Sequence, residues 1–272
     1  MSVPLECPKR KEMRRAMRSL EKHIKGLEPD HQIEIDSAEI GQIRFLPMVL
    51  NENSKDRPAF FTPLDGNLLP TPDDQYDQEY EQEYLAHDSI SEECRDPKTC
   101  TQAIDIYWSS YLSHYSFSTK PAGGEVVWSP VQLIWSPVYK ERDLFRIEYP
   151  EFGFYDIERV TEGPYAHLKA TIYNNLNAND GHILQGELLP ILRLMKAHLR
   201  WARFIDHMVA PMMVFSLVGP QHARVIEAYL EGHTLVVRPT KLYDLRTKDE
   251  ATLKMFAQWY FGKPRAPTGT SQ

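Results

Sequence analysis

The chain has 272 residues, of which 42% are hydrophobic and 11% aromatic, so it can bury a substantial core and is not an intrinsically disordered protein. Its apolar runs are shorter than the 18 or more residues that a bilayer span needs, and its start lacks the apolar segment of a signal peptide. We therefore expect a soluble, intracellular protein without a transmembrane segment, either cytoplasmic or nuclear. A net charge of −7 argues against nucleic-acid binding over the whole surface, but the charge is unevenly distributed.

Residues 1–28 predict a basic amphipathic helix. Between Lys9 and Lys25 there are eight basic residues and two acids, and an apolar line runs through the segment at steps of three and four. This line consists of Met13, Met17, Leu20, Ile24 and Leu27. Such helices lie on anionic membranes, dock in a partner's groove or contact phosphates, and the basic start resembles a nuclear import signal. The alternative is that the apolar line packs on the body of the protein and the charges are solvated.

The next two segments predict an N-terminal region that is extended. Residues 29–72 are expected to form short strands and proline-rich loops, with edge strands at 32–35 and 43–50 that can pair with each other. Residues 73–99 predict an acidic linker, because Asp73 to Asp96 contains ten acids and one arginine. This acidic tract is also a candidate to lie in cis across a basic face of the same chain.

Residues 100–262 predict an α+β core domain with a mixed sheet and one long amphipathic helix packed on it. The helix is indicated by apolar residues at steps of three and four from Leu184 to Ile205. Strands are expected at 126–138, 144–149, 152–157 and 212–218, and further helices at 102–115, 165–176 and 250–261. Residues 224–238 predict a hairpin around Glu231-Gly232, with a helix over 221–230 as the alternative. Residues 263–272 predict a disordered tail.

A cationic row on the long helix is the leading candidate for a binding site. Basic side chains recur there at steps of three and four beside the apolar stripe, so they are expected to share one helix face. They are Arg193, Lys196, Arg200, Arg203 and His207. We expect a non-enzymatic binding or scaffold protein that engages an acidic protein segment, a phosphate-bearing ligand, or its own residues 73–96. The alternative is a solvated helix face.

Four carboxylates support a second hypothesis, that of a metal-dependent hydrolase. Asp156 and Glu158 point the same way on an expected strand, Glu148 lies one strand earlier, and Glu187 lies on the long helix. Paired carboxylates can hold Mg²⁺ or perform acid–base chemistry.

The order of elements over 126–260, strands followed by a helix and further strands, resembles the restriction-endonuclease-like folds of the PD-(D/E)xK class. This resemblance implies a nuclease-like fold in which the four carboxylates bind Mg²⁺. The signature lysine of that class is missing along the chain, because Tyr149-Pro150 follows Glu148 and Arg159-Val160 follows Glu158.

A third hypothesis is an enzyme that acts on a small organic substrate in a pocket lined by Trp108, Tyr111, Trp128 and Trp135. No metal site or other cofactor is expected outside the hydrolase hypothesis, because the histidines lack metal-binding spacing and no glycine-rich nucleotide loop is present. Four motifs also look like those of uncharacterised proteins of filamentous fungi. They are Trp135-Ser136-Pro137, Asp180-Gly181-His182, Gly219-Pro220-Gln221 and residues 256–261.

Overall fold

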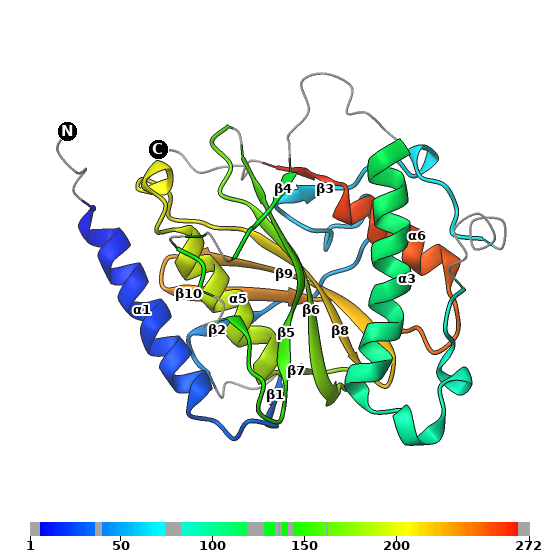
Figure 1. Cartoon of the computed structure of the whole chain (residues 1–272). Helices are drawn as coiled ribbons and strands as arrows, with labels where there is room; N and C mark the ends of the chain where they lie inside the picture. The colour runs from blue at the N-terminus through cyan, green and yellow to red at the C-terminus, as the bar shows by residue number, and fades with distance from the viewer. Residues whose placement is uncertain are drawn as a thin grey trace.

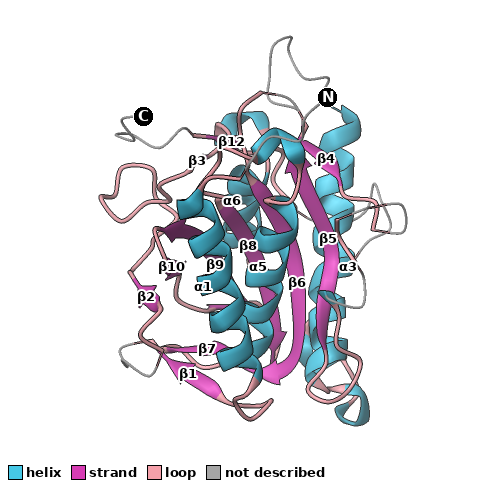
Figure 2. Cartoon of the chain, turned by 90° about the vertical axis from the view of Figure 1, so that its left-hand side faces the viewer, coloured by secondary structure: helices cyan, strands magenta, loops and turns pink. Residues whose placement is uncertain are grey.

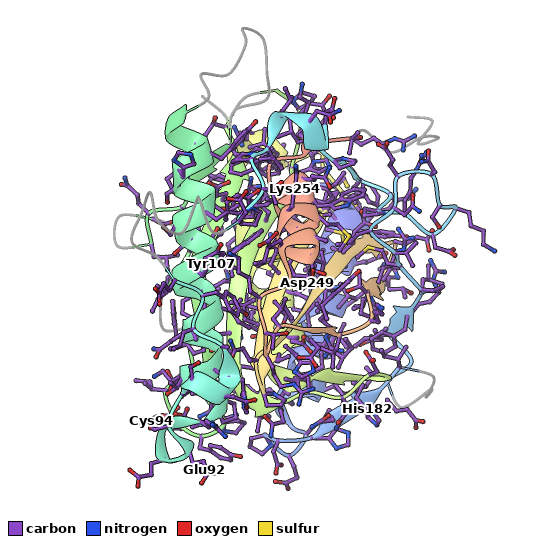
Figure 3. The ribbon with its side chains drawn as sticks, turned by 90° about the vertical axis from the view of Figure 1, so that its right-hand side faces the viewer. Glu92, Cys94, Tyr107, His182, Asp249 and Lys254 are labelled. Atoms are coloured by element: carbon purple, nitrogen blue, oxygen red, sulfur yellow. The ribbon has the colours of Figure 1, made fainter. Side chains whose placement is uncertain are left out.

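A large mixed sheet lies between two sets of helices (Figure 1). The computed structural model describes residues 6–35, 40–73, 83–118, 128–133, 136, 138–140, 144–161 and 163–265. Helix α5 (Gln185–His198) lies on one face of the sheet with α1 (Pro8–Lys25) outside it. Helices α3 (Pro97–Ser118) and α6 (Glu250–Tyr260) cover the opposite face (Figure 3). The expected α+β class with a mixed sheet is therefore confirmed.

The main sheet has the strand order β2-β10-β9-β8-β6-β5-β4, with β11 paired to the start of β9. Its strands are β2 (Ile43–Phe45), β4 (Trp128–Pro130), β5 (Phe152–Val160), β6 (Leu168–Asn177), β8 (Met212–Gly219), β9 (His222–Glu231), β10 (Thr234–Pro239) and β11 (Tyr243–Asp244). The β6·β8 and β2·β10 pairs are parallel and the other pairs are antiparallel. The crossover from β6 to β8 carries α5, as a parallel connection requires.

Two small sheets and four short 3₁₀ helices complete the described chain. Strand β1 (Gln32–Glu34) pairs with β7 (His182–Leu184), and β3 (Phe61–Thr62) pairs with β12 (Lys263–Pro264). The 3₁₀ helices are Gly66–Leu68, His87–Ser89, Glu92–Cys94 and Ala202–Phe204. The expected pairing of the two N-terminal strands with each other is therefore wrong, because each pairs with a strand of the later chain.

The N-terminal region is not extended as expected. Helix α1 packs on α5 through Met13, Met17, Leu20 and Ile24, all of which are buried. Strand β2 joins the edge of the main sheet beside β10. Both contacts remove apolar surface from water, which the isolated N-terminal segment cannot do alone.

Several expected elements agree with the structure, and one has the wrong type. The strand at 212–218, the helices near 102–115 and 250–261, and the hairpin of β9 and β10 are present, with Gly232 at φ 62° in the turn. The expected helix over 165–176 is instead strand β6. Leu168, Ala170 and Ile172 alternate with Lys169 and Thr171, as in a strand, but Leu168, Ile172 and Leu176 also recur at steps of four, and that helical spacing predicted the wrong type. The expected strand at 144–149 is reduced to a single bridge between Arg146 and Phe152.

The long helix predicted from Leu184 to Ile205 is shorter than expected. Helix α5 has 14 residues and ends at His198, whereas α1 has 18 and α3 has 22. The following segment turns away, and its main-chain carbonyls accept hydrogen bonds from the guanidinium of Arg10 on α1. These acceptors are the carbonyls of Leu199, Phe204, Ile205 and His207. A contact with a distant helix thus satisfies carbonyls that a continuing helix would have bonded internally.

Candidate anion-binding site

The surface between α1 and α5 gathers cationic side chains from two helices that are far apart in the sequence. Arg10 is 3% exposed and fixes the start of α1 to the segment after α5. Because the apolar side of α1 is buried against the protein, the rotation of the helix is fixed, and so is the set of its polar side chains that lie beside α5. In the view of Figure 2, α1 lies in front of α5 as the outermost layer.

The centre of this surface is a hollow of about 50 Å³, which we call the cationic hollow. It is lined by Arg14, Arg18, Lys196 and Arg200. Arg14 pairs with Glu6 at 2.9 Å and Lys196 pairs with Glu21. Arg18 and Arg200 are exposed, and neither forms an ion pair with another described residue. Two exposed guanidinium groups that have no ion pair within the described chain therefore line this hollow.

A wider hollow of about 160 Å³ adjoins it and shares Lys196 and Arg200. Among the described residues that line it, Arg193 and Lys140 add cations and Glu21 is the single acidic side chain. Arg193 Nε donates to Glu21 Oε1 at 3.0 Å. Burial alone would raise the pKa of Glu21, but its hydrogen bonds and charge contacts with Lys196 and Arg193 lower it overall. Glu21 therefore stays ionised and holds α5 against α1.

The structure brings only part of the predicted cationic row together. Arg193, Lys196 and Arg200 meet at the α1–α5 surface, whereas the helix has ended before Arg203 and His207. Arg203 donates to the carbonyls of Val160 and Thr161, and a ring nitrogen of His207 lies 2.6 Å from the carbonyl of Pro164. A single row on one helix face is therefore not formed, because the last two side chains are used to hold neighbouring loops.

Sequence reasoning missed the cations that complete the site, Arg14, Arg18 and Lys140. The basic residues of α1 were visible as a helix face, but their convergence with α5 depends on long-range packing. The signal that could have linked them is the match between two apolar stripes at helical spacing, one on each helix.

The four candidate carboxylates do not form one site. Glu148 is exposed in the turn before β5, and Asp156 and Glu158 of β5 face α6. Glu187 lies on α5 at the opposite face of the sheet, where it is fully buried and paired with Arg224. Within the described ranges, no three His, Cys, Asp or Glu side chains are placed to hold a metal ion.

Asp156 and Glu158 instead belong to an internally bonded network with Lys169, which sequence reasoning missed. The β5–β6 register sets Lys169 opposite Glu158, with its Nζ 2.8 Å from Glu158 Oε2. Asp156 accepts from the Thr171 amide at 3.0 Å and from the Tyr260 hydroxyl at 2.7 Å. Burial raises the pKa of Asp156 and lowers that of Lys169. Assigning residues 168–177 to a strand would have revealed Lys169, because it lies opposite Glu158 on the neighbouring strand and not two residues after it in the sequence.

The aromatic residues proposed for a substrate pocket are used in packing where the structure describes them. Trp108 and Tyr111 are at most 2% exposed and belong to the core on the α6 side. Trp128 donates its indole N–H to the carbonyl of Gly262 at 2.9 Å and lies under the Lys169 ammonium. Trp135 lies outside the described residues.

The acidic tract is described in part, at Asp73 and from residue 83 onward; residues 74–82 lie outside the described chain. Its described second half lies on the α3 side, away from α1, where the Tyr84 hydroxyl donates to the carbonyl of Leu245. None of the described helices is long and apolar enough to cross a membrane. Comparison with protein-family models, with curated proteins and with solved structures found no match to this chain.

Proposed function

We propose that this is a binding protein whose α1–α5 surface takes up phosphate groups of a partner. The observation that supports the proposal is the convergence of four cations on the cationic hollow, two of which, Arg18 and Arg200, form no ion pair with another described residue. Like charges this close repel each other, and the repulsion is relieved when an anion lies between them. Guanidinium groups suit phosphate because their planar N–H pairs match its oxygens.

The test is a titration of the full chain with inorganic pyrophosphate, in which binding is measured by calorimetry or by NMR of the arginine side chains. The double variant R18Q/R200Q removes the two guanidinium groups of the cationic hollow that form no ion pair with another described residue. Its affinity for pyrophosphate should fall about tenfold for each guanidinium group removed, because one charge-assisted hydrogen bond contributes about 1.5 kcal/mol. The control is K55Q/K241Q, which removes two exposed charges from loops outside the α1–α5 surface. Equal affinity of both double variants for pyrophosphate would refute the proposal.

The same titration separates phosphate from acidic protein partners. An oligo-glutamate peptide carries the same sign of charge without the tetrahedral oxygen geometry that guanidinium groups match. Tighter binding of the peptide than of pyrophosphate, lost in R18Q/R200Q, would assign the surface to an acidic protein segment instead.

A further inference from the structure

The outer face of α1 carries a second set of cations that continues from the cationic hollow. We call this set the outer stripe. It consists of Lys11, Arg15, Arg18, Lys22 and Lys25, at steps of four, three, four and three residues. This spacing places all five on one side of the helix, opposite the buried apolar line. All five side chains are exposed, and none forms an ion pair with another residue of the described chain.

The outer stripe is held as a rigid array. Its helix is anchored by the buried apolar line and by Arg10, which donates to four main-chain carbonyls after α5. From Lys11 to Lys25 the stripe extends about 21 Å at 1.5 Å per residue. Over this length a nucleic-acid duplex presents roughly twelve phosphates, one for each 1.7 Å of its axis. Arg18 belongs to both the stripe and the cationic hollow, so the two form one continuous surface.

We infer that the partner of this surface is a double-stranded nucleic acid, contacted through its phosphate backbone without regard to sequence. The inference rests on the proposed function and specifies the polymer that carries the phosphates. Backbone contacts by lysine and arginine provide affinity and carry no base readout. DNA and RNA duplexes share this chemistry.

Three features of the stripe favour a duplex over other anionic partners. A membrane-surface helix inserts its apolar side, but Met13, Met17, Leu20 and Ile24 are at most 2% exposed. Sites for single strands stack bases on aromatic rings, and α1 contains no Phe, Tyr or Trp. Protein interfaces centre on apolar anchors and are depleted in lysine, whereas three of the five stripe residues are lysines. A rigid, purely cationic ridge best matches the high and regular charge density of a duplex.

The experiment measures binding of the full chain to labelled DNA and RNA duplexes of about 20 base pairs. The stripe spans about six base pairs at roughly 3.4 Å per base pair, so these duplexes are longer than the surface that contacts them. The corresponding single strands and phosphatidylserine vesicles are the competing probes. If all five stripe residues neutralise phosphates, the slope of log K against log salt should be about −4.5, from roughly −0.9 per contact. At least one duplex should bind more tightly than its single strand and than the vesicles.

The variant K11Q/R15Q/K22Q tests the stripe and leaves the cationic hollow intact. Its slope should fall in magnitude by about 2.7, while pyrophosphate binding stays unchanged. The control K55Q/R57Q/K241Q makes the same change in net charge outside α1 and should keep the slope of the natural chain. The inference is overturned if no duplex binds, if single strands or vesicles bind as tightly, or if the control loses as much slope as the stripe variant. The pyrophosphate titration reports on the proposed function separately in each case.

Discussion

Replacing Glu187 by glutamine should strongly destabilise the protein. The carboxylate is 0% exposed and accepts four hydrogen bonds at the centre of the α5 face. Arg224 Nε donates to it at 2.8 Å and its second donor completes a bidentate pair, while the Ser216 hydroxyl and the Leu184 amide donate at 2.7 and 2.8 Å. Glutamine keeps the shape of the side chain but leaves the Arg224 guanidinium buried without a counter-charge. Breaking a buried pair in this way costs about 3 to 5 kcal/mol.

Urea unfolding followed by circular dichroism measures this cost, with E231Q as the matched control. Glu231 pairs with Arg44 at the surface, where both side chains are about half exposed, so its loss should change stability by less than about 1 kcal/mol. The double variant E187L/R224M should be less destabilised than either of its single variants, E187L and R224M, because no uncompensated charge remains. A loss below about 1 kcal/mol in E187Q, or additive losses in the double variant, would show that the reasoning about this pair is mistaken.

Two further predictions concern α1 and the α3 side. R10M should lower the free energy of unfolding by about 3 kcal/mol, because buried carbonyls such as that of Leu199 lose their hydrogen-bond donor. The control K11M, on the exposed outer stripe, should change the free energy of unfolding by less than about 0.5 kcal/mol. Equal stability of the two variants in urea would contradict this prediction. Burial, followed by the charge of Asp156, raises the pKa of Asp105 to about 7. In the folded state Asp105 therefore keeps a proton that the unfolded chain releases, so stability falls as pH rises towards 7. D105N should have a higher Tm than the natural chain at pH 8, and this difference in Tm should shrink as pH falls from 7 towards 3.8, the ordinary pKa of an aspartate. A difference in Tm that does not depend on pH would show that the raised pKa of Asp105 is not its cause.

Local patterns in the sequence were sufficient for elements whose residues contact their own neighbours or one apolar surface. The apolar line of α1 predicts its helix and its buried side without reference to the rest of the chain. Strand β8 follows from an apolar run, interrupted only at Ser216 and closed by Gly219-Pro220. The β9–β10 hairpin follows from Glu231-Gly232, where glycine supplies the positive φ of the turn. These features depend on the spacing of apolar residues and on backbone preferences, and both can be read from short segments of the sequence.

The candidate site depended on contacts between distant segments, which short stretches do not encode. Helix α5 ends at His198, and the carbonyls that follow are bound by Arg10, almost two hundred residues earlier in the chain. Likewise Lys169 meets Glu158 only through the register of two strands, one of which has the apolar spacing of a helix when read alone. The sequence determined that cations occur on α1 and on α5. Tertiary packing alone decided which of them meet, because it is the burial of the two apolar stripes against each other that brings Arg18 and Arg200 to one hollow.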